Sequence, residues 1–439
     1  MSKYTPVIGL EVHVELKTKS KMFCTCSASY FGEKPNTHTC PVCLGLPGAL
    51  PVPNKLAIEW CVKIALALNC KINEYSKFDR KNYFYPDLAK GYQISQYDLP
   101  FGKNGHIELN NGKKIRILRV HMEEDTGKLS HQEVNGKKVS LIDFNRSGVP
   151  LVEIVTEPDF DNALDVKEYL EKLHQIVRYL EVSDADMDKG EMRLEPNISL
   201  TTIPGKLPNY KVEVKNINSF KFVEKAINYE IIRQEEILEK GDTPAQETRG
   251  WDENKQITFS QRSKEDAHDY RYFPEPDIPP IVLKKTQISR IGREVPELPN
   301  KKRLRFEIDY ALATYDAEIL TREKPLADYF EQTIKKNANK LELKAIANWI
   351  INKKVDYTKV STDDLLKQIV TSKQVAQIDE KELQKFINEV LLENEKAVTD
   401  YKNGKEASLM FLLGQTMKKI GKKVDTQMVK QQLQKALQK

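Results

Sequence analysis

The chain of 439 residues has no run of about eighteen apolar residues, the length that a helix needs to cross a bilayer. It also lacks the Walker A, G-x-G-x-x-G and G-x-S-x-G patterns, so P-loop, Rossmann and α/β-hydrolase interpretations lose their usual support. Its first residues lack the apolar core of a secretory signal, and we therefore expect a cytoplasmic protein. Any nucleotide chemistry must use another fold.

Cysteine is scarce, with six residues in the whole chain. In a reducing compartment this favours metal ligands or buried thiols over disulfides. Four of them form two close pairs separated by 13 residues, a pattern typical of tetrahedral zinc coordination that leaves no open catalytic position. We predict a structural zinc knuckle at about residues 24–43, and the alternative is four unrelated thiols. The predicted ligands are Cys24, Cys26, Cys40 and Cys43.

Proline nearly disappears after residue 299, where only Pro325 remains. Before this point, strand patterns mix with helical ones, such as a helix expected from an N-cap at Ser219 to a C-cap at Gly241. After it, apolar residues follow helical periodicity. We therefore expect an α+β fold, with a catalytic domain of mixed or antiparallel sheet at 1–294, an all-α domain at 295–402 and a basic helical tail at 403–439.

Several expected strands have one apolar face and one ionisable face, because successive side chains of a strand point in opposite directions. Between residues 9 and 16, the apolar residues alternate with Glu11, His13 and Glu15. Between residues 118 and 123, Leu118, Val120 and Met122 alternate with Arg119, His121 and Glu123, and Met192, Leu194 and Ile198 alternate with polar residues further on.

Acidic residues and one histidine on these strands predict a divalent cation site. Carboxylate oxygens are the ligands that Mg²⁺ prefers, and Glu11, His13 and the acidic segment at 121–125 can supply the protein ligands. Histidine is an uncommon magnesium ligand, so Mn²⁺ stays open. The alternative is an acidic turn before Gly127, with the histidine hydrogen-bonded inside the sheet.

Cations beside aromatic or polar residues occur in two further segments, at 78–87 and 143–150. Lys81 and Arg146 in these segments can neutralise a phosphate or a developing acyl phosphate, although such groupings also occur at ordinary domain edges. The last 39 residues carry nine lysines and two acids, as expected of a segment that meets a polyanion or of a solvated helix face.

Long motifs, in order along the chain, resemble the GatB family of tRNA-dependent amidotransferase subunits. The residues that carry this resemblance are Gly-Leu-Glu-Val-His at 9–13, Cys-Pro-Val-Cys-Leu-Gly-Leu-Pro-Gly at 40–48, Phe-Asp-Arg-Lys-Asn-Tyr-Phe-Tyr-Pro-Asp at 78–87, His-Met-Glu-Glu-Asp at 121–125 and Asp-Phe-Asn-Arg-Ser-Gly-Val-Pro at 143–150. The similarity covers essentially the whole chain. One departure is Glu195, where the family usually has aspartate.

The resemblance implies a cradle similar in fold to glutamine synthetase and an ATP-dependent transamidation of Glu-tRNA(Gln) or Asp-tRNA(Asn). The side-chain carboxylate takes phosphate from ATP, and ammonia comes from the amidase subunit of a heterotrimer that also contains a small subunit. The implied cofactors are ATP, Mg²⁺ and structural zinc, and the implied Mg²⁺ ligands are Glu11, His13, Glu123 and Glu124. The implied catalytic residues are Lys81, Glu124 and Arg146, and the basic tail predicts tRNA contacts at Lys418, Lys419, Lys422 and Lys423.

Two other classes of function stay open. The cysteines and the basic tail alone are compatible with a non-enzymatic, zinc-containing tRNA-binding module. The acidic strands alone are compatible with a self-sufficient ligase that resembles glutamine synthetase and uses free ammonia without tRNA.

Overall fold

The computed structural model describes residues 3–203, 205–263, 270–338, 341–373, 378–421 and 424–438. The chain forms two compact units, one of residues 1–305 with 322–324 and one of residues 306–321 with 325–439. The first unit combines helices with a large sheet, and the described part of the second is helical. The predicted α+β class is therefore confirmed.

A sheet of nine strands organises the first unit, in the order β14-β13-β12-β11-β1-β10-β7-β6-β2. The pair β12 and β13 is parallel, and the other pairs of this sheet are antiparallel, so the sheet is mixed, as expected. Its strands are β1 (Thr5–Glu15), β2 (Lys71–Ile72), β6 (Gly102–Glu108), β7 (Lys114–Glu124), β10 (Pro150–Thr156), β11 (Met192–Thr201), β12 (Val212–Lys215), β13 (Glu247–Asp252) and β14 (Ile257–Ser263).

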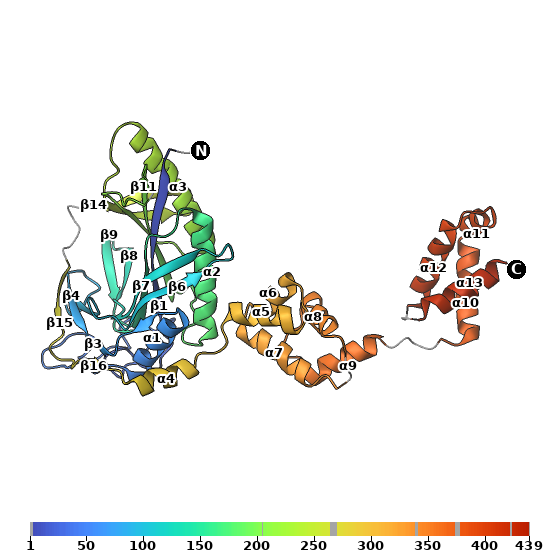
Figure 1. Cartoon of the computed structure of the whole chain (residues 1–439), viewed down its shortest axis with the longest axis horizontal. Coiled ribbons are helices and arrows are strands. Elements are labelled where there is room, and N and C mark those ends of the chain that lie inside the picture. The colour runs from blue at the N-terminus through green and yellow to red at the C-terminus, as the bar shows by residue number, and fades with distance from the viewer. Residues whose placement is uncertain are drawn as a thin grey trace. The chain divides into compact units, whose positions relative to one another are not determined.

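Three helices cover the apolar face of this sheet, namely α1 (Lys55–Ala67), α2 (Ala163–Tyr179) and α3 (Phe220–Glu239). Val12 and Val14 of β1 are fully buried in one core with apolar residues of all three helices. Figure 1 shows α2 and α3 running along one side of the strands. Since side chains alternate along a strand, the ionisable residues of β1 must face away from these helices.

The ends of α3 follow the predicted capping signals. Ser219 has extended backbone and accepts a hydrogen bond from the N–H of Phe222. Gly241 follows the last helical turn with a φ of +86°, a left-handed conformation that glycine adopts without a Cβ penalty. Local sequence therefore fixes the length of the longest described helix.

The alternation expected at 118–123 is interrupted. Val120 and Met122 are fully buried, but Leu118 is 38% exposed. The register between β7 and β10 shifts between Val155 and Thr156, which pair with Arg119 and Ile117. Leu118 is therefore the additional residue of a β-bulge, and the prediction that it shares the buried face is wrong.

Smaller sheets and one further helix also belong to the first unit. A three-stranded sheet has the order β15-β4-β5, and its strand β5 contributes Gln93 and Ser95 as donors to Glu123 of β7. This sheet therefore approaches the ionisable end of β7. The remaining elements are β3 (Tyr75–Ser76), β4 (Asp79–Asn82), β5 (Tyr92–Ser95), β8 (Lys128–Val134), β9 (Lys137–Asp143), β15 (Arg271–Pro274), β16 (Ile281–Val282) and α4 (Lys285–Arg293).

The second unit contains two apolar cores. One is built from buried residues between Phe306 and Ile369, and the other from buried residues between Leu383 and Leu437. The second core joins α10 to α12 and α13, so it spans the domain boundary that we expected at residue 402. Among the described residues, no helix has the length and hydropathy of a membrane span. The helices that follow α4 are α5 (Pro299–Asp309), which the boundary between the two units divides, α6 (Thr314–Thr321), α7 (Lys324–Lys335), α8 (Leu343–Asn352), α9 (Thr362–Lys373), α10 (Glu380–Glu393), α11 (Glu395–Lys402), α12 (Ala407–Ile420) and α13 (Thr426–Leu437).

Candidate active site

The face of the large sheet opposite the helices presents a row of ionisable side chains. The strand register pairs His13 of β1 with Glu153 of β10 on one side and with Arg193 of β11 on the other. Glu153 in turn pairs with His121 of β7. Directly paired residues project to the same face of a sheet. The adjacent strands β11, β1, β10 and β7 therefore contribute side chains to one row.

Two carboxylates lie between the two histidines. Oε2 of Glu153 is 3.1 Å from Nε2 of His121 and 3.6 Å from Nε2 of His13. Oxygens of Glu123 are 3.5 Å and 3.9 Å from the same two nitrogens. One ligand atom from each of His13, Glu123 and Glu153 lies within 4.8 Å of the others, so the three can bind one ion together. The structure thus brings the predicted ligands His13 and Glu123 together and adds Glu153, which was not predicted.

Burial among opposite charges sets the protonation of this group. Burial by itself lowers the pKa of His13, but the interaction with Glu153 and the nearby carboxylates raise it to about 9. Burial opposes ionisation of Glu153, yet His121 and His13 hold the pKa of this carboxyl well below its ordinary value. Among the described residues, Nδ1 of each histidine is buried without a hydrogen-bond partner. Each of the two histidines therefore keeps one ring nitrogen without a hydrogen-bond partner in the described part of the chain, beside the ionised carboxylates of Glu123 and Glu153.

A second group of acids lies on the same face. Glu11, Glu195 and Glu213 each place a carboxylate oxygen within 4.8 Å of the others. Burial and then the charges of Glu153, Glu213 and Glu195 raise the pKa of Glu11. Lys215 partly compensates, because its Nζ is 2.9 Å from Oε2 of Glu195. Three close carboxylates form a donor set that suits a hard divalent cation, and the Lys215 ammonium group offsets part of their charge.

Glu124, which we expected beside Glu123, does not join either group. Consecutive residues of β7 point to opposite sides, and the Glu124 carboxylate accepts a hydrogen bond from the N–H of Ile94 at 2.9 Å. It also forms an ion pair with Lys90. The predicted metal set of Glu11, His13, Glu123 and Glu124 is therefore divided among three places.

The two predicted catalytic cations have different surroundings. Nζ of Lys81 lies 3.8 Å from Oε1 of Glu123 and 4.8 Å from the ring centroid of Tyr270, so it belongs to the first acid group. Arg146 donates from Nε to the carbonyl oxygen of Thr126 at 3.0 Å and lies 3.6 Å from Oδ1 of Asp125. Arg146 therefore holds the turn after β7, whereas Lys81 faces the acids.

Arg193 is a cation of this face that sequence analysis did not single out. Its Nη1 and Nη2 donate to the two oxygens of Asp125 at 3.2 Å and 2.9 Å. Burial opposes ionisation of Asp125, but Arg146 and Arg193 keep the pKa of this carboxyl below its ordinary value. The alternation along the strand was its only available signal, because its partner lies 68 positions away.

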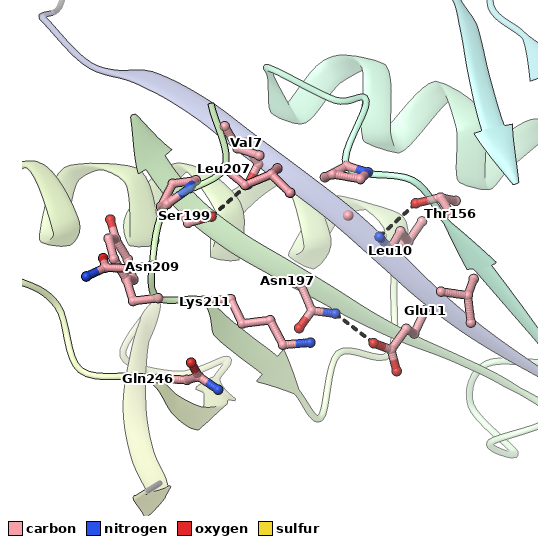
Figure 2. A pocket seen from close by; sticks show the side chains of 15 residues that line it. Val7, Leu10, Glu11, Thr156, Asn197, Ser199, Leu207, Asn209, Lys211 and Gln246 are labelled. Carbon is pink, nitrogen blue, oxygen red and sulfur yellow. Dashed lines mark hydrogen bonds between the residues drawn. The ribbon is translucent and has the colours of Figure 1, made fainter. Parts of the chain in front are cut away.

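A cavity of about 390 Å³ opens beside Glu11 (Figure 2). Asn197 donates from Nδ2 to Oε1 of Glu11 at 3.0 Å, and Figure 2 shows Lys211 extended toward these two residues. Apolar walls and amide groups complete the lining. The lining residues are Val7, Gly9, Leu10, Glu11, Val155, Thr156, Pro158, Asn197, Ser199, Leu207, Pro208, Asn209, Tyr210, Lys211 and Gln246. The cavity therefore places one ammonium group and several amides next to the second acid group, in a volume suited to a small molecule.

The four cysteines of the predicted knuckle come together. Their sulfur atoms all lie within 4.8 Å of one another, and none of the four is in a disulfide. A hydrogen bond with Cys24 and then the backbone N–H of Cys40, 3.1 Å from its sulfur, lower the pKa of Cys43 to about 5, although burial opposes this. The donor set of four sulfurs fits zinc. Cys61 and Cys70 are buried in the apolar core, as simple core thiols.

The family model described as the GatB/GatE catalytic domain matches residues 6–289, and the model described as the GatB domain matches residues 353–437. The chain is 46% identical to the B subunit of the aspartyl/glutamyl-tRNA(Asn/Gln) amidotransferase of Carboxydothermus hydrogenoformans, with both chains covered completely. The chain belongs to the GatB family. The protein of the same name from Thermotoga maritima is 45% identical, with 99% of each chain covered.

Membership of the GatB family makes this chain part of an enzyme, and both acid groups lie within the part that the catalytic domain model matches. Glu195, where this chain departs from the usual aspartate, lies in the second acid group. Glu153 and Glu213 were missed by sequence analysis. The available signal for Glu153 was a single acid inside strand β10, whose other residues except Thr156 are apolar, but nothing local identifies its partners.

The predicted tRNA-binding lysines of this GatB family member lie in the segment matched by the second family model. Lys418 is exposed on α12. Nζ of Lys419 is 3.1 Å from Oε2 of Glu389 and also pairs with Glu393, so its charge is largely compensated within the chain. Lys422 and Lys423 lie outside the described residues.

Proposed function

We propose that this chain performs the ATP-dependent transamidation of mischarged Glu-tRNA(Gln), Asp-tRNA(Asn) or both. The observation that carries the proposal is the meeting of two acid groups and a small-molecule cavity on one face of the sheet. The curated relatives, which are named as the B subunit of the corresponding amidotransferase, support the same activity.

The reaction explains why such a face is needed. A side-chain carboxylate resists ammonia because its leaving group would be oxide or hydroxide. Transfer of the terminal phosphoryl group of ATP to this carboxylate breaks a phosphoanhydride bond and forms an acyl phosphate, and ammonia then displaces phosphate to give the amide. Anions must approach one another in the first step, so electrostatic stabilisation dominates its catalysis.

His13, Glu123 and Glu153 would hold one divalent cation, and Glu11, Glu195 and Glu213 would hold a second. The fit is supported by the donor sets, by the raised pKa of Glu11 and by the unpartnered Nδ1 atom of His13 among the described residues. Bound Mg²⁺ supplies Lewis-acid neutralisation of phosphate oxygens.

The cavity of Figure 2 is the proposed nucleotide pocket. Leu207 and Val7 offer apolar contact to a base, Asn209 and Gln246 offer amide donors and acceptors, and Lys211 offers a cation to phosphate groups. Glu11 lies at the junction between this cavity and the second acid group. This arrangement directs the phosphate end of a bound nucleotide toward the acids.

Lys81 is the proposed charge-compensating residue for the acyl phosphate. Burial lowers its pKa, but Glu123, the tyrosines nearby and Glu153 raise the value well above that of an ordinary lysine, so the ammonium form persists. Tyr83 and Tyr270 pack edge to face with ring centroids 5.4 Å apart beside it. Aromatic walls of this kind exclude water from a hydrolysable intermediate.

Ammonia and tRNA complete the proposal. The sequence has no amidase nucleophile motif, so ammonia is supplied by the amidase subunit of a heterotrimer, in which a small subunit is the third member. Zinc bound by Cys24, Cys26, Cys40 and Cys43 has a structural role, because four thiolates fill its coordination sphere. The helical unit and the basic tail bind tRNA through its phosphates.

The test is reconstitution of the chain with the amidase and small subunits, followed by measurement of the amino acid attached to the tRNA. Glutamine, ATP and Mg²⁺ are supplied with Glu-tRNA(Gln) or Asp-tRNA(Asn). Conversion of either substrate that requires ATP supports the proposal. ATP-independent conversion, or conversion of free glutamate without tRNA, contradicts it.

The matched variants are Glu11→Gln in the second acid group and Glu157→Gln directly after β10. Glu11→Gln removes a carboxylate that the proposed cation needs, so amidation should be lost, whereas Glu157→Gln should retain it. Loss of amidation in both variants contradicts the assignment of the acid groups, and so does retention of amidation in both.

A further inference from the structure

Lys21 is a fully buried lysine that none of the proposed chemical steps uses. Its side chain has no exposed surface, although it follows the bridge residue Ser20 in a loop. Lysine is almost never fully buried unless its charge is paired, because taking an isolated ammonium group out of water is very costly. Its position therefore requires an anionic neighbour.

Two of the three acceptors of its ammonium group are uncharged. Nζ donates to the carbonyl oxygen of His38 at 2.7 Å and to that of Phe144 at 3.3 Å. The third is Sγ of Cys43, at 3.8 Å. Among the described residues, no carboxylate forms an ion pair with Lys21, and the Glu124 carboxylate nearby is already paired with Lys90.

The four-cysteine group supplies the missing negative charge only when its sulfurs are ionised. Four thiolates around Zn²⁺ carry a net charge of −2, most of it on the sulfur atoms. Without a metal, the group carries less negative charge than four thiolates around zinc, even with the lowered pKa of Cys43. A buried ammonium group in contact with one of the sulfurs therefore matches the metal-loaded group better than the free thiols.

We propose that Lys21 is the built-in counter-ion of the four-cysteine zinc centre, a positioning residue that stabilises the Cys43 thiolate and offsets part of the charge of the loaded site. Its two carbonyl acceptors belong to the cysteine loop and to the turn at 143–150. The ammonium group of Lys21 therefore links these two segments by hydrogen bonds. The inference rests on the proposed zinc site and goes beyond it, because Lys21 is not a ligand.

The experiment measures the zinc dissociation constant of the full-length chain by competition with a chromophoric chelator. The test variant is Lys21→Met, which keeps most of the side-chain volume and removes the charge. The matched control is Lys19→Met, an exposed lysine two positions earlier. Loss of an outer-sphere partner of a metal site typically weakens metal affinity about 10–100-fold. We expect this loss for Lys21→Met and less than about twofold change for Lys19→Met.

A purely structural role of Lys21 predicts a different result. Unfolding measured with and without zinc closes a thermodynamic cycle, in which a structural residue lowers stability equally in both states. A counter-ion lowers stability mainly in the zinc-loaded state. Equal destabilisation in both states, with unchanged zinc affinity, overturns the proposal.

Two further outcomes are distinguishable. If Lys21→Met does not fold, Lys21→Gln, which keeps a polar donor without the charge, is measured in the same way, and unchanged zinc affinity in that variant overturns the proposal. If the unmodified chain binds no zinc, the zinc site itself is contradicted and the counter-ion role with it. Zinc binding of the unmodified chain with unchanged affinity in the variants contradicts the role of Lys21 alone.

Discussion

Oε2 of Glu153 lies 3.1 Å from Nε2 of His121, its partner in the register of β10 and β7. His13 approaches the same oxygen from the other neighbouring strand, at 3.6 Å. A carboxylate between two histidines on adjacent strands is held in place before any ligand binds. Glu153, and not Glu124, therefore lies with Glu123 in the first acid group.

Glu153→Gln should lower the amidation rate of the reconstituted enzyme about 100-fold, because it removes a carboxylate ligand of the proposed cation that neutralises the phosphate oxygens. Amidation rates and Mn²⁺ binding by electron paramagnetic resonance are the measurements. Glu124→Gln should leave Mn²⁺ binding to the first acid group unchanged, since its carboxylate pairs with Lys90. Stronger loss of Mn²⁺ binding in Glu124→Gln than in Glu153→Gln would reverse this assignment.

Glu195→Asp should keep the amidation rate within about tenfold, whereas Glu195→Gln should lose about 100-fold. The reason is that the carboxylate of Glu195 belongs to a group with Glu11 and Glu213, where its charge matters more than its length. Steady-state amidation by both variants is the measurement. Equal activity of the aspartate and glutamine variants would show that charge at this position has no part in the reaction.

Removal of zinc should lower the unfolding temperature of the chain by about 5–10 °C, since structural zinc stabilises the folded state by several kcal/mol. Thermal unfolding is followed with and without a chelator. The chelator should have the same effect on Cys70→Ser as on the unmodified chain and no effect on Cys40→Ser. A chelator effect that persists in Cys40→Ser would place the metal elsewhere.

Lys418→Ala should reduce the slope of log affinity for tRNA against log salt by about one, as expected for the loss of one phosphate contact. Lys419→Ala should change the slope less, because Glu389 and Glu393 already pair with this lysine. Binding is measured by fluorescence anisotropy over a range of salt concentrations. The opposite order of the two slopes would exclude Lys418 from the tRNA contact.

Asp159→Asn should lower stability at neutral pH by about 1 kcal/mol. Burial opposes ionisation of Asp159, but hydrogen bonds from Arg116 lower its pKa in the folded state. A folded-state pKa below the unfolded value gives stability that is present above the unfolded pKa and lost as the pH falls through the folded pKa. The difference between the variant and the unmodified chain should therefore be constant from pH 7 to about pH 5 and shrink at lower pH.

Denaturant unfolding at several pH values is the measurement for Asp159→Asn. A difference that grows toward acid pH would contradict the sign of the pKa shift.

Local patterns in the sequence were sufficient for several features. Alternation along β1 identified Glu11 and His13 as neighbours on one face, since it depends only on strand geometry. Ser219 and Gly241 identified the ends of α3 through capping preferences. The cysteine spacing identified the knuckle because both pairs lie within one short loop. These features involve residues close together in the chain.

The tertiary structure alone decided which residues share the site. Glu153 and Glu213 joined the acid groups through contacts between strands that are far apart in the chain. The physical reason is strand register, because a shift of one residue moves a whole set of side chains to the other face. Periodicity determines which side chains lie together on one strand, and only the pairing of the strands determines which charges meet across them.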